Sequence, residues 1–127
     1  MAETREQSIL VVDDNPDDRE LFGRVLERGG YSVVERITGK EALTAVEKAT
    51  FDLMTLDLSM PDMDGFDVLR AVRSKHPELK IIVVSGFRHG GMSKAAKSLG
   101  AATTLDKNLA TDLLLPMVRD LLNDPNE

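Results

Sequence analysis

The sequence of 127 residues contains no cysteine and no tryptophan, and it has one tyrosine. The absence of cysteine excludes a disulfide framework, a thiolate metal site and a cysteine nucleophile. No apolar run approaches the roughly 18 residues of a membrane span, and the polar first seven residues lack the apolar stretch of a signal peptide. Basic residues are outnumbered, with 16 Lys and Arg against 22 Asp and Glu. We therefore expect a cytoplasmic, acidic protein that binds neither nucleic acid nor membrane directly.

The composition that remains is that of one packed domain. Hydrophobic residues make up 42% of the chain and charged residues 30%, which suffices for a core with a solvated surface. The length corresponds to about one domain. We expect a single domain over 1–127, with a core of about 8–122 and frayed ends at 1–7 and 123–127.

Five short apolar runs alternate with longer stretches of helical periodicity. The runs, which we interpret as strands, are 8–12, 31–34, 51–56, 81–84 and 101–105. Asn15 and Pro16 are typical of a helix start, and the last helix is expected over about 111–123. Pro116 is expected in the first turn of that helix, or otherwise at a kink. Strict alternation predicts a parallel sheet with helices on both faces.

Polar side chains follow four of the five predicted strands. Asp13-Asp14 follow the first, Asp57 the third, Ser85 closes the fourth and Lys107 lies just past the fifth. Because parallel sheets bind ligands beyond the carboxyl ends of their strands, we expect these residues to converge on one edge.

This set of residues has the chemistry of phosphoryl transfer. Three carboxylates and one lysine leave about −2 of charge, which raises carboxyl pKa values unless a cation enters. A hard divalent ion is the natural partner; Mg²⁺ fits best, and Mn²⁺ could substitute. Lys107 and Ser85 could stabilise a transferring phosphoryl group. Asp57 is best placed to act as the nucleophile and to form an aspartyl phosphate.

Together these motifs resemble the receiver domain of two-component response regulators. The resemblance rests on Asp13-Asp14, on the segment 57–65 (Asp-Leu-Ser-Met-Pro-Asp-Met-Asp-Gly), on Ser85-Gly86 and on Lys107, and it covers essentially the whole chain. It implies a flavodoxin-like, CheY-like α/β fold, a doubly wound five-stranded parallel sheet in the order 2-1-3-4-5.

The resemblance also implies a role for each site residue. Asp57 would accept a phosphoryl group from a phosphohistidine. Asp14 would ligate Mg²⁺ directly, Asp13 chiefly through water, and the backbone carbonyl of Ser59 would be a further ligand. Lys107 would pair with a phosphoryl oxygen, as would a Ser85 hydroxyl that turns inward.

The implied partners are a sensor histidine kinase or a histidine phosphotransfer protein. A downstream protein would read the face formed by the fourth helix, fifth strand and fifth helix, and a homodimer is a further expectation. Such a domain is no enzyme for outside substrates, since it supports only its own phosphorylation and dephosphorylation.

Two positions depart from the family pattern. Thr104 stands three residues before the lysine, where receivers usually carry an aromatic, and Asn108 stands where proline is usual. Phe87 is a candidate for the missing aromatic. A cis bond before a non-proline residue costs about 2.5–4 kcal/mol, so we predict a trans Lys107–Asn108 peptide.

Three alternatives compete with the phosphoacceptor hypothesis. A phosphorylation-independent receiver scaffold is compatible with the departures at Thr104 and Asn108. A small Mg²⁺-dependent phosphohydrolase shares the site chemistry, but Ser59 stands where the haloacid dehalogenase family has a second aspartate, and the chain has no length for a capping domain. A flavodoxin-like cofactor binder is disfavoured by acidic strand-end loops and few aromatic residues.

Overall fold

A computed structural model describes residues 6–58, 64–86 and 90–122, and for residues 90–93 it describes the backbone alone. The strands are β1 (Ser8–Val12), β2 (Ser32–Arg36), β3 (Leu53–Leu56), β4 (Lys80–Ser85) and β5 (Thr103–Asp106). The helices are α1 (Pro16–Arg28), α2 (Gly39–Lys48), α3 (Gly65–Lys75), α4 (Gly90–Ser98), the 3₁₀-helix η1 (Lys107–Leu109) and α5 (Ala110–Leu122).

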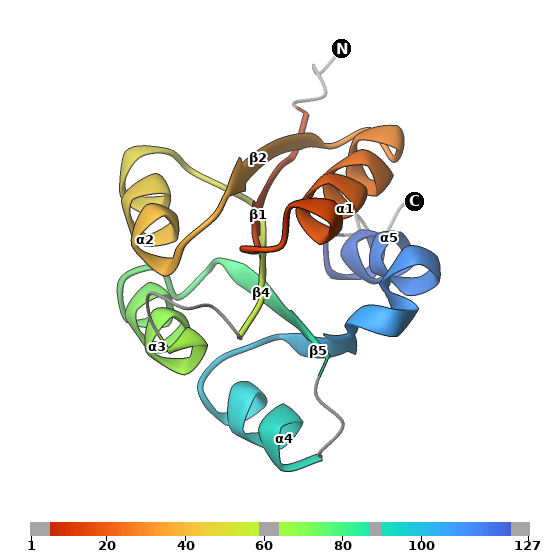
Figure 1. Cartoon of the computed structure of the whole chain (residues 1–127). Helices are drawn as coiled ribbons and strands as arrows, with labels where there is room; N and C mark the ends of the chain where they lie inside the picture. Colours follow the sequence, from red (N-terminus) through yellow and green to blue (C-terminus); the bar gives the residue numbers. More distant parts are fainter. Residues whose placement is uncertain (1–5, 59–63, 87–89, 123–127) are drawn as a thin grey trace.

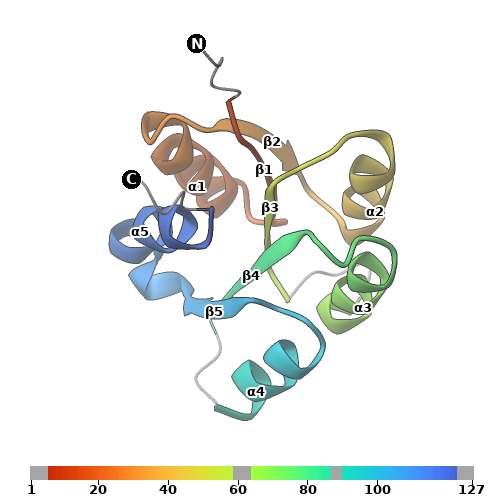
Figure 2. The ribbon, with the colours of Figure 1, turned by 180° about the vertical axis from the view of Figure 1, so that it is seen from behind.

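The described strands form one parallel five-stranded sheet in the order β2-β1-β3-β4-β5. This confirms the predicted α/β class, the parallel pairing and the strand order. Figures 1 and 2 show the helices on both sides of the sheet, with α1 and α5 on one side and α2, α3 and α4 on the other. The connections that place them there are too long for hairpins, as parallel pairing requires.

Burial on both faces explains why the central strands are continuous apolar runs. Along β1, Ile9 and Val11 pack with α1 and α5, whereas Leu10 and Val12 pack with the helices opposite. All four side chains are 0–1% exposed. Neither side of β1 therefore faces solvent.

The first helix begins where the sequence predicts. Asn15 is its N-cap, and the Asn15 side chain accepts hydrogen bonds from the N–H groups of Asp17 and Asp18 at 2.9 and 3.0 Å. Pro16 occupies the first helical position, where its missing N–H costs nothing. This cap places the start of α1 directly beyond Asp13-Asp14.

The placement of Pro116 in the first turn of the last helix was wrong. The helix α5 begins at Ala110, so Pro116 lies in its second turn. The hydrogen bond that proline cannot donate belongs to the carbonyl of Asp112, and both residues are exposed. Water can solvate that carbonyl, which lowers the cost of the missing hydrogen bond. Burial of Leu114 and Val118 stabilises the helix on both sides of the proline.

Several strand boundaries also differ from the predicted runs by one or two residues. The strand β2 ends at Arg36 rather than at 34, β3 begins at Leu53 rather than at 51, and β5 covers Thr103–Asp106 rather than 101–105. No helix in the described part of the chain is long and apolar enough to cross a bilayer.

Candidate functional site

Asp13 is fixed at the carboxyl end of β1 by its backbone and its side chain. Its N–H donates to the carbonyl of Arg36 at 3.2 Å, and its carbonyl accepts from Nη1 of Arg19 at 2.8 Å. Its Oδ1 accepts from the N–H of Asn15 at 2.9 Å. The residue is 1% exposed. The carboxylate is thus held in one orientation at the buried edge of the sheet.

Asp57 lies beside Asp13 because β1 and β3 are neighbours. Its N–H donates to the carbonyl of Val12 at 3.1 Å, which extends the β1–β3 pairing by one bond, and it is 3% exposed. Carboxylate oxygens of Asp13, Asp14 and Asp57 lie within 4.8 Å of one another. The structure therefore brings together the three predicted carboxylates, a donor set that suits a hard divalent cation. Ser59 lies outside the described residues.

Lys107 reaches this cluster from the other half of the sheet. It opens η1 directly after β5, and Asp106 caps that turn by accepting from the N–H of Asn108 at 2.9 Å. Lys107 Nζ lies 3.0 Å from Asp13 Oδ2 and 3.1 Å from Asp57 Oδ2. The Lys107–Asn108 peptide is trans, as predicted. The ammonium is thus a direct neighbour of the candidate phosphoacceptor.

A further carboxylate, which the sequence analysis did not assign to the site, contacts the same lysine. Lys107 Nζ lies 2.9 Å from Oδ2 of Asp18 in the first turn of α1. Acidic residues are common at helix starts because the helix dipole favours them there. The sequence therefore did not mark Asp18 as a residue of the site. Only its position in the chain could have indicated Asp18, because the cap at Asn15 puts this turn next to Asp13-Asp14.

Burial and neighbouring groups change the pKa values of two residues of the site, Asp13 and Lys107. Burial raises the pKa of the Asp13 carboxyl to about 6; the charge of Asp57 adds to the rise, while hydrogen bonds from Asn15 and Lys107 oppose it. Burial lowers the pKa of Lys107, but hydrogen bonds to Asp18 and Asp13 and the charge of Asp57 outweigh it and raise that pKa above its ordinary value. The lysine is therefore cationic, and a metal ion bound to the cluster would offset the cost of the ionised, buried Asp13 carboxylate.

Ser85 is a further predicted site residue at this edge. It ends β4, is 2% exposed and pairs with Asp106 of β5, one residue before Lys107. Thr104, in the position that is usually aromatic, is half-buried and pairs with Val83. Phe87, the candidate substitute for that aromatic, lies outside the described residues.

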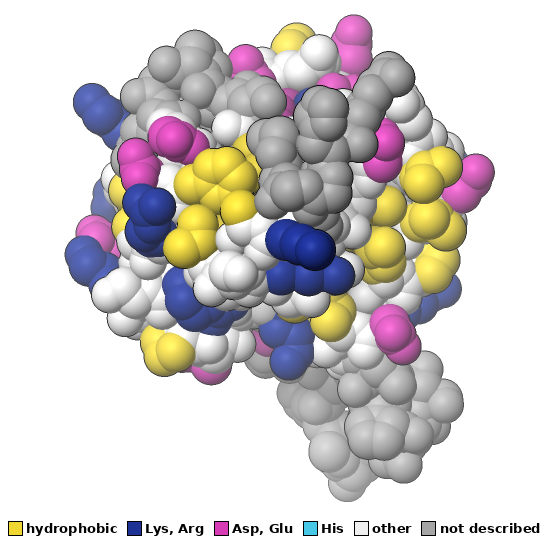
Figure 3. All heavy atoms as spheres, turned by 90° about the horizontal axis from the view of Figure 1, so that it is seen from below, with side chains coloured by type: hydrophobic (Ala, Val, Ile, Leu, Met, Phe, Trp, Pro, Cys, Tyr) yellow, Lys and Arg dark blue, Asp and Glu magenta, His cyan; other side chains and the backbone are white. Residues whose placement is uncertain are grey.

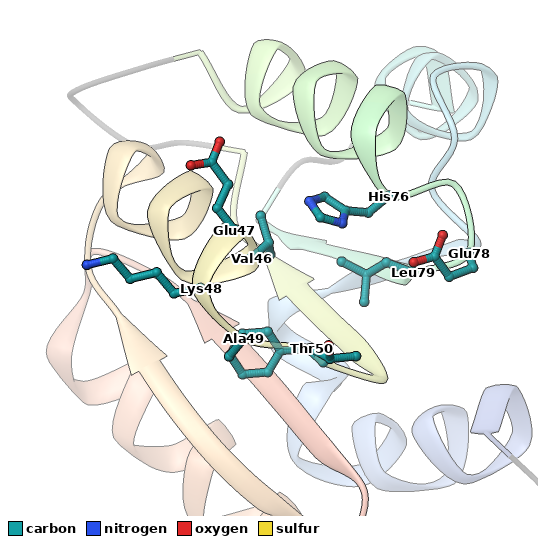
Figure 4. A pocket seen from close by; sticks show the side chains of 9 residues that line it. Val46, Glu47, Lys48, Ala49, Thr50, His76, Glu78 and Leu79 are labelled. Atoms are coloured by element: carbon teal, nitrogen blue, oxygen red, sulfur yellow. The ribbon is translucent and has the colours of Figure 1, made fainter.

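A hollow of about 240 Å³ lies at the opposite edge of the sheet. Figure 4 shows His76 and Leu79, from the segment after α3, facing Val46 and Glu47 of α2 across it. These residues precede β4 or end α2, so they lie at the amino ends of the strands. The hollow therefore takes no part in the site built by Asp13, Asp57 and Lys107.

Comparison with known proteins agrees with this geometry. The model of the response regulator receiver domain matches residues 9–119. The sporulation initiation phosphotransferase F of Bacillus subtilis is 30% identical, over 91% of this chain and 94% of that protein. A CheY-like receiver domain protein from Methanospirillum hungatei superposes with a TM-score of 0.89 at 28% identity, over 94% of this chain and 95% of that chain.

A third relative has a solved structure with ligands. The response regulator TrrA from Thermotoga maritima, in complex with Mg²⁺-BeF, has a TM-score of 0.82 at 33% identity, over 91% of this chain and 98% of that chain. Some curated relatives are much longer, and the chain spans 9% and 49% of two of them. The match of the family model over most of the sequence, together with the sheet order and the acidic cluster, means that this chain belongs to the receiver domains of two-component response regulators.

Proposed function

We propose that Asp57 is the residue of this receiver domain that takes up the phosphoryl group. The observation that carries the proposal is the position of its carboxylate, with Lys107 Nζ at 3.1 Å from Oδ2 and oxygens of Asp13 and Asp14 within 4.8 Å. Of the two buried carboxylates in the cluster, Asp13 and Asp57, Asp57 is the one that directly follows β3, the central strand of the sheet. A nucleophile there is flanked by the lysine and by a potential cation site.

The transfer is a displacement at phosphorus. An oxygen of Asp57 forms the new P–O bond as the P–N bond of a phosphohistidine breaks, and the imidazole nitrogen keeps the electron pair. Lys107 donates to an oxygen of the transferring group and offsets its charge, and the hydroxyl of Ser85 donates to another. Mg²⁺, which Asp13, Asp14, Asp57 and the carbonyl of Ser59 would hold, supplies further neutralisation of these oxygens when bound. Mn²⁺ has the same ligand preference and could substitute.

The donor set supports this assignment of the metal. The ligands are hard carboxylate oxygens, and burial together with the charge of Asp57 raises the pKa of Asp13, a cost that a bound cation would offset. The Thermotoga relative, crystallised in complex with Mg²⁺-BeF, is consistent with the same assignment.

Receiver domains interact with histidine kinases or phosphotransfer proteins, and we propose such a protein as the phosphoryl donor here. We propose that a downstream protein, or a second copy of the chain, reads the face of α4, β5 and α5. Figure 3, which views the molecule from the α4 side, shows Lys and Arg side chains among apolar ones. Leu109 and Leu113 on η1 and α5 are 50% and 39% exposed. In this proposal residues 1–127 form one receiver domain that acts on no outside substrate.

Acetyl phosphate tests the proposal without a cognate kinase. The chain is incubated with acetyl phosphate and Mg²⁺, and intact mass is followed over time, with and without a chelator. We expect the gain of one phosphoryl group in wild type, none in Asp57→Asn, and none when the metal is chelated. Equal labelling of Asp57→Asn would refute Asp57 as the acceptor. No labelling of wild type would favour the phosphorylation-independent scaffold, and catalytic turnover of a small phosphate ester would favour the phosphohydrolase.

A further inference from the structure

Lys107 is held by three carboxylates that differ in what else they can do. Asp13 and Asp57 belong to the cluster that could bind a divalent cation, whereas Asp18 lies outside that cluster. Asp18 also makes the shortest of the three contacts, at 2.9 Å from Lys107 Nζ. Lysine and Asp18 are 20% and 32% exposed, so the pair is partly shielded from water.

A cation in the cluster would change the balance of forces on the lysine. It would share the charges of Asp13 and Asp57 and repel the ammonium a few ångströms away. Lysine is a point charge on a flexible four-carbon stem, so it needs an anchor to stay over Asp57. Asp18 can supply one, because the cap at Asn15 fixes its turn of α1 and because its carboxylate is not shared with the metal.

We propose that Asp18 is a positioning residue that holds the Lys107 ammonium over the Asp57 carboxylate while the divalent cation is bound. The inference rests on the proposed function of Asp57 and Lys107, and Asp18 acts only through that lysine. The bridge also fastens the first turn of α1 to η1, two elements that are distant in sequence. Loss of the carboxylate should therefore slow phosphoryl uptake rather than unfold the domain.

The chain contains a matched control for this idea. Asp17 precedes Asp18 in the same turn of α1, carries the same charge and is exposed, and its N–H bonds to the same cap. Substitution of either aspartate by alanine removes one negative charge and a similar favourable interaction with the helix dipole. The rate constant for phosphorylation by acetyl phosphate with Mg²⁺ is measured for Asp18→Ala, Asp17→Ala, Asp18→Glu and Lys107→Ala, and for Asp18→Ala combined with Lys107→Ala.

We expect Asp18→Ala to lower the rate about threefold to fivefold, the size of a partly exposed ion pair. Asp17→Ala should match wild type, and Asp18→Glu should recover part of the rate. In the Lys107→Ala background, Asp18→Ala should have no further effect. Urea unfolding of each variant checks that the domain remains folded.

Three results would overturn the inference alone: equal slowing by Asp17→Ala, an unchanged or faster rate in Asp18→Ala, or slowing by Asp18→Ala that persists without Lys107. A wild-type rate in Lys107→Ala would instead remove the proposed role of the lysine, and the inference with it. That outcome is separable, because Asp57→Asn would still show whether the acceptor is correct.

Discussion

Asp13 is a buried carboxylate whose burial works against its charge. It is 1% exposed, and burial raises the pKa of its carboxyl from 3.8 to about 6. The folded state therefore binds a proton at Asp13 more tightly than the unfolded chain does. For this group, the metal-free fold gains stability as the pH falls from 7 toward 4, and the cost of the ionised carboxylate is fully present above pH 6.

Asp13→Asn should consequently stabilise the metal-free protein at neutral pH. The amide oxygen can still accept from the N–H of Asn15, while the buried charge is removed. The rise in the pKa of Asp13, which already includes the opposing contact with Lys107, corresponds to a gain of about 3 kcal/mol at most. Urea unfolding with a chelator at pH 7 and pH 5 measures the free energy of unfolding.

The gain should be present at pH 7 and should shrink at pH 5, where wild type is protonated as well. Asp17→Asn is the control for a change in net charge on the exposed surface. A variant that is destabilised equally at both pH values would show that the Asp13 carboxylate contributes to the fold rather than straining it.

Among single residues, the sequence identifies as site residues those polar ones that end an apolar run. Asp13, Asp57 and Lys107 each follow a strand, and the geometry of parallel sheets is enough to bring them together. Asp18 was missed because a helix start already accounts for an acidic residue. Its contact with Lys107 depends on how the start of η1 lies against the start of α1, and periodicity does not encode that distance.

Pro116 is an element-scale feature whose cost can be measured. It interrupts α5 in the second turn and leaves the carbonyl of Asp112 without its helical donor. Proline is about 3 kcal/mol less favourable than alanine in a helix interior, but it also restricts the unfolded chain. Pro116→Ala should therefore stabilise the domain by about 1–2 kcal/mol, measured by urea unfolding.

Thr111→Ala serves as the control, since that position on α5 is also exposed. A neutral or destabilising Pro116→Ala would mean that the helix has adapted to the proline and gains nothing from the restored hydrogen bond.

Gly65 shows how an element boundary constrains the site. It starts α3, and a Cβ at this position would lie 2.4 Å from Cα of Leu58, the residue directly after Asp57. Backbone cannot move aside as a side-chain tip can, so Gly65→Ala should cost about 1–3 kcal/mol. Gly86→Ala is the matched control, because a Cβ there meets nothing within 4 Å. Equal unfolding free energies for the two variants would contradict the close packing of α3 on this segment.

The ends of the strands were less predictable than their positions in the chain. The strand β2 lies at the sheet edge, and Glu35 and Arg36 at its end are exposed. Their backbone still pairs with β1, and the N–H of Asp13 donates to the carbonyl of Arg36. Because an edge strand can extend its hydrogen bonds without burying side chains, the apolar run ended before the strand did.

For the whole molecule, the alternation of apolar runs with stretches of helical periodicity was enough to predict a parallel sheet covered on both faces. It did not determine which strands are neighbours, and the order 2-1-3-4-5 came with the family resemblance. That order places β1 and β3 side by side at the centre, with β4 and β5 beyond them. Asp13 and Asp14 therefore come from one side of β3 and Lys107 from the other, so the site depends on the complete fold.

Because the cluster forms only when β1 and β3 are paired, Mg²⁺ should bind the folded chain and not the unfolded one. Saturation at about 100 times the dissociation constant should add about 2.7 kcal/mol to the free energy of unfolding. The metal must displace a proton from Asp13 below about pH 6, so the apparent affinity should fall by up to about tenfold per pH unit there. Urea unfolding across a Mg²⁺ series at pH 7.5 and pH 5 measures both effects. The double variant Asp13→Asn with Asp14→Asn should lose the stabilisation at either pH. If it kept the wild-type response, the ion would be binding elsewhere on the acidic surface, and the carboxyl edge of the sheet would not be the metal site.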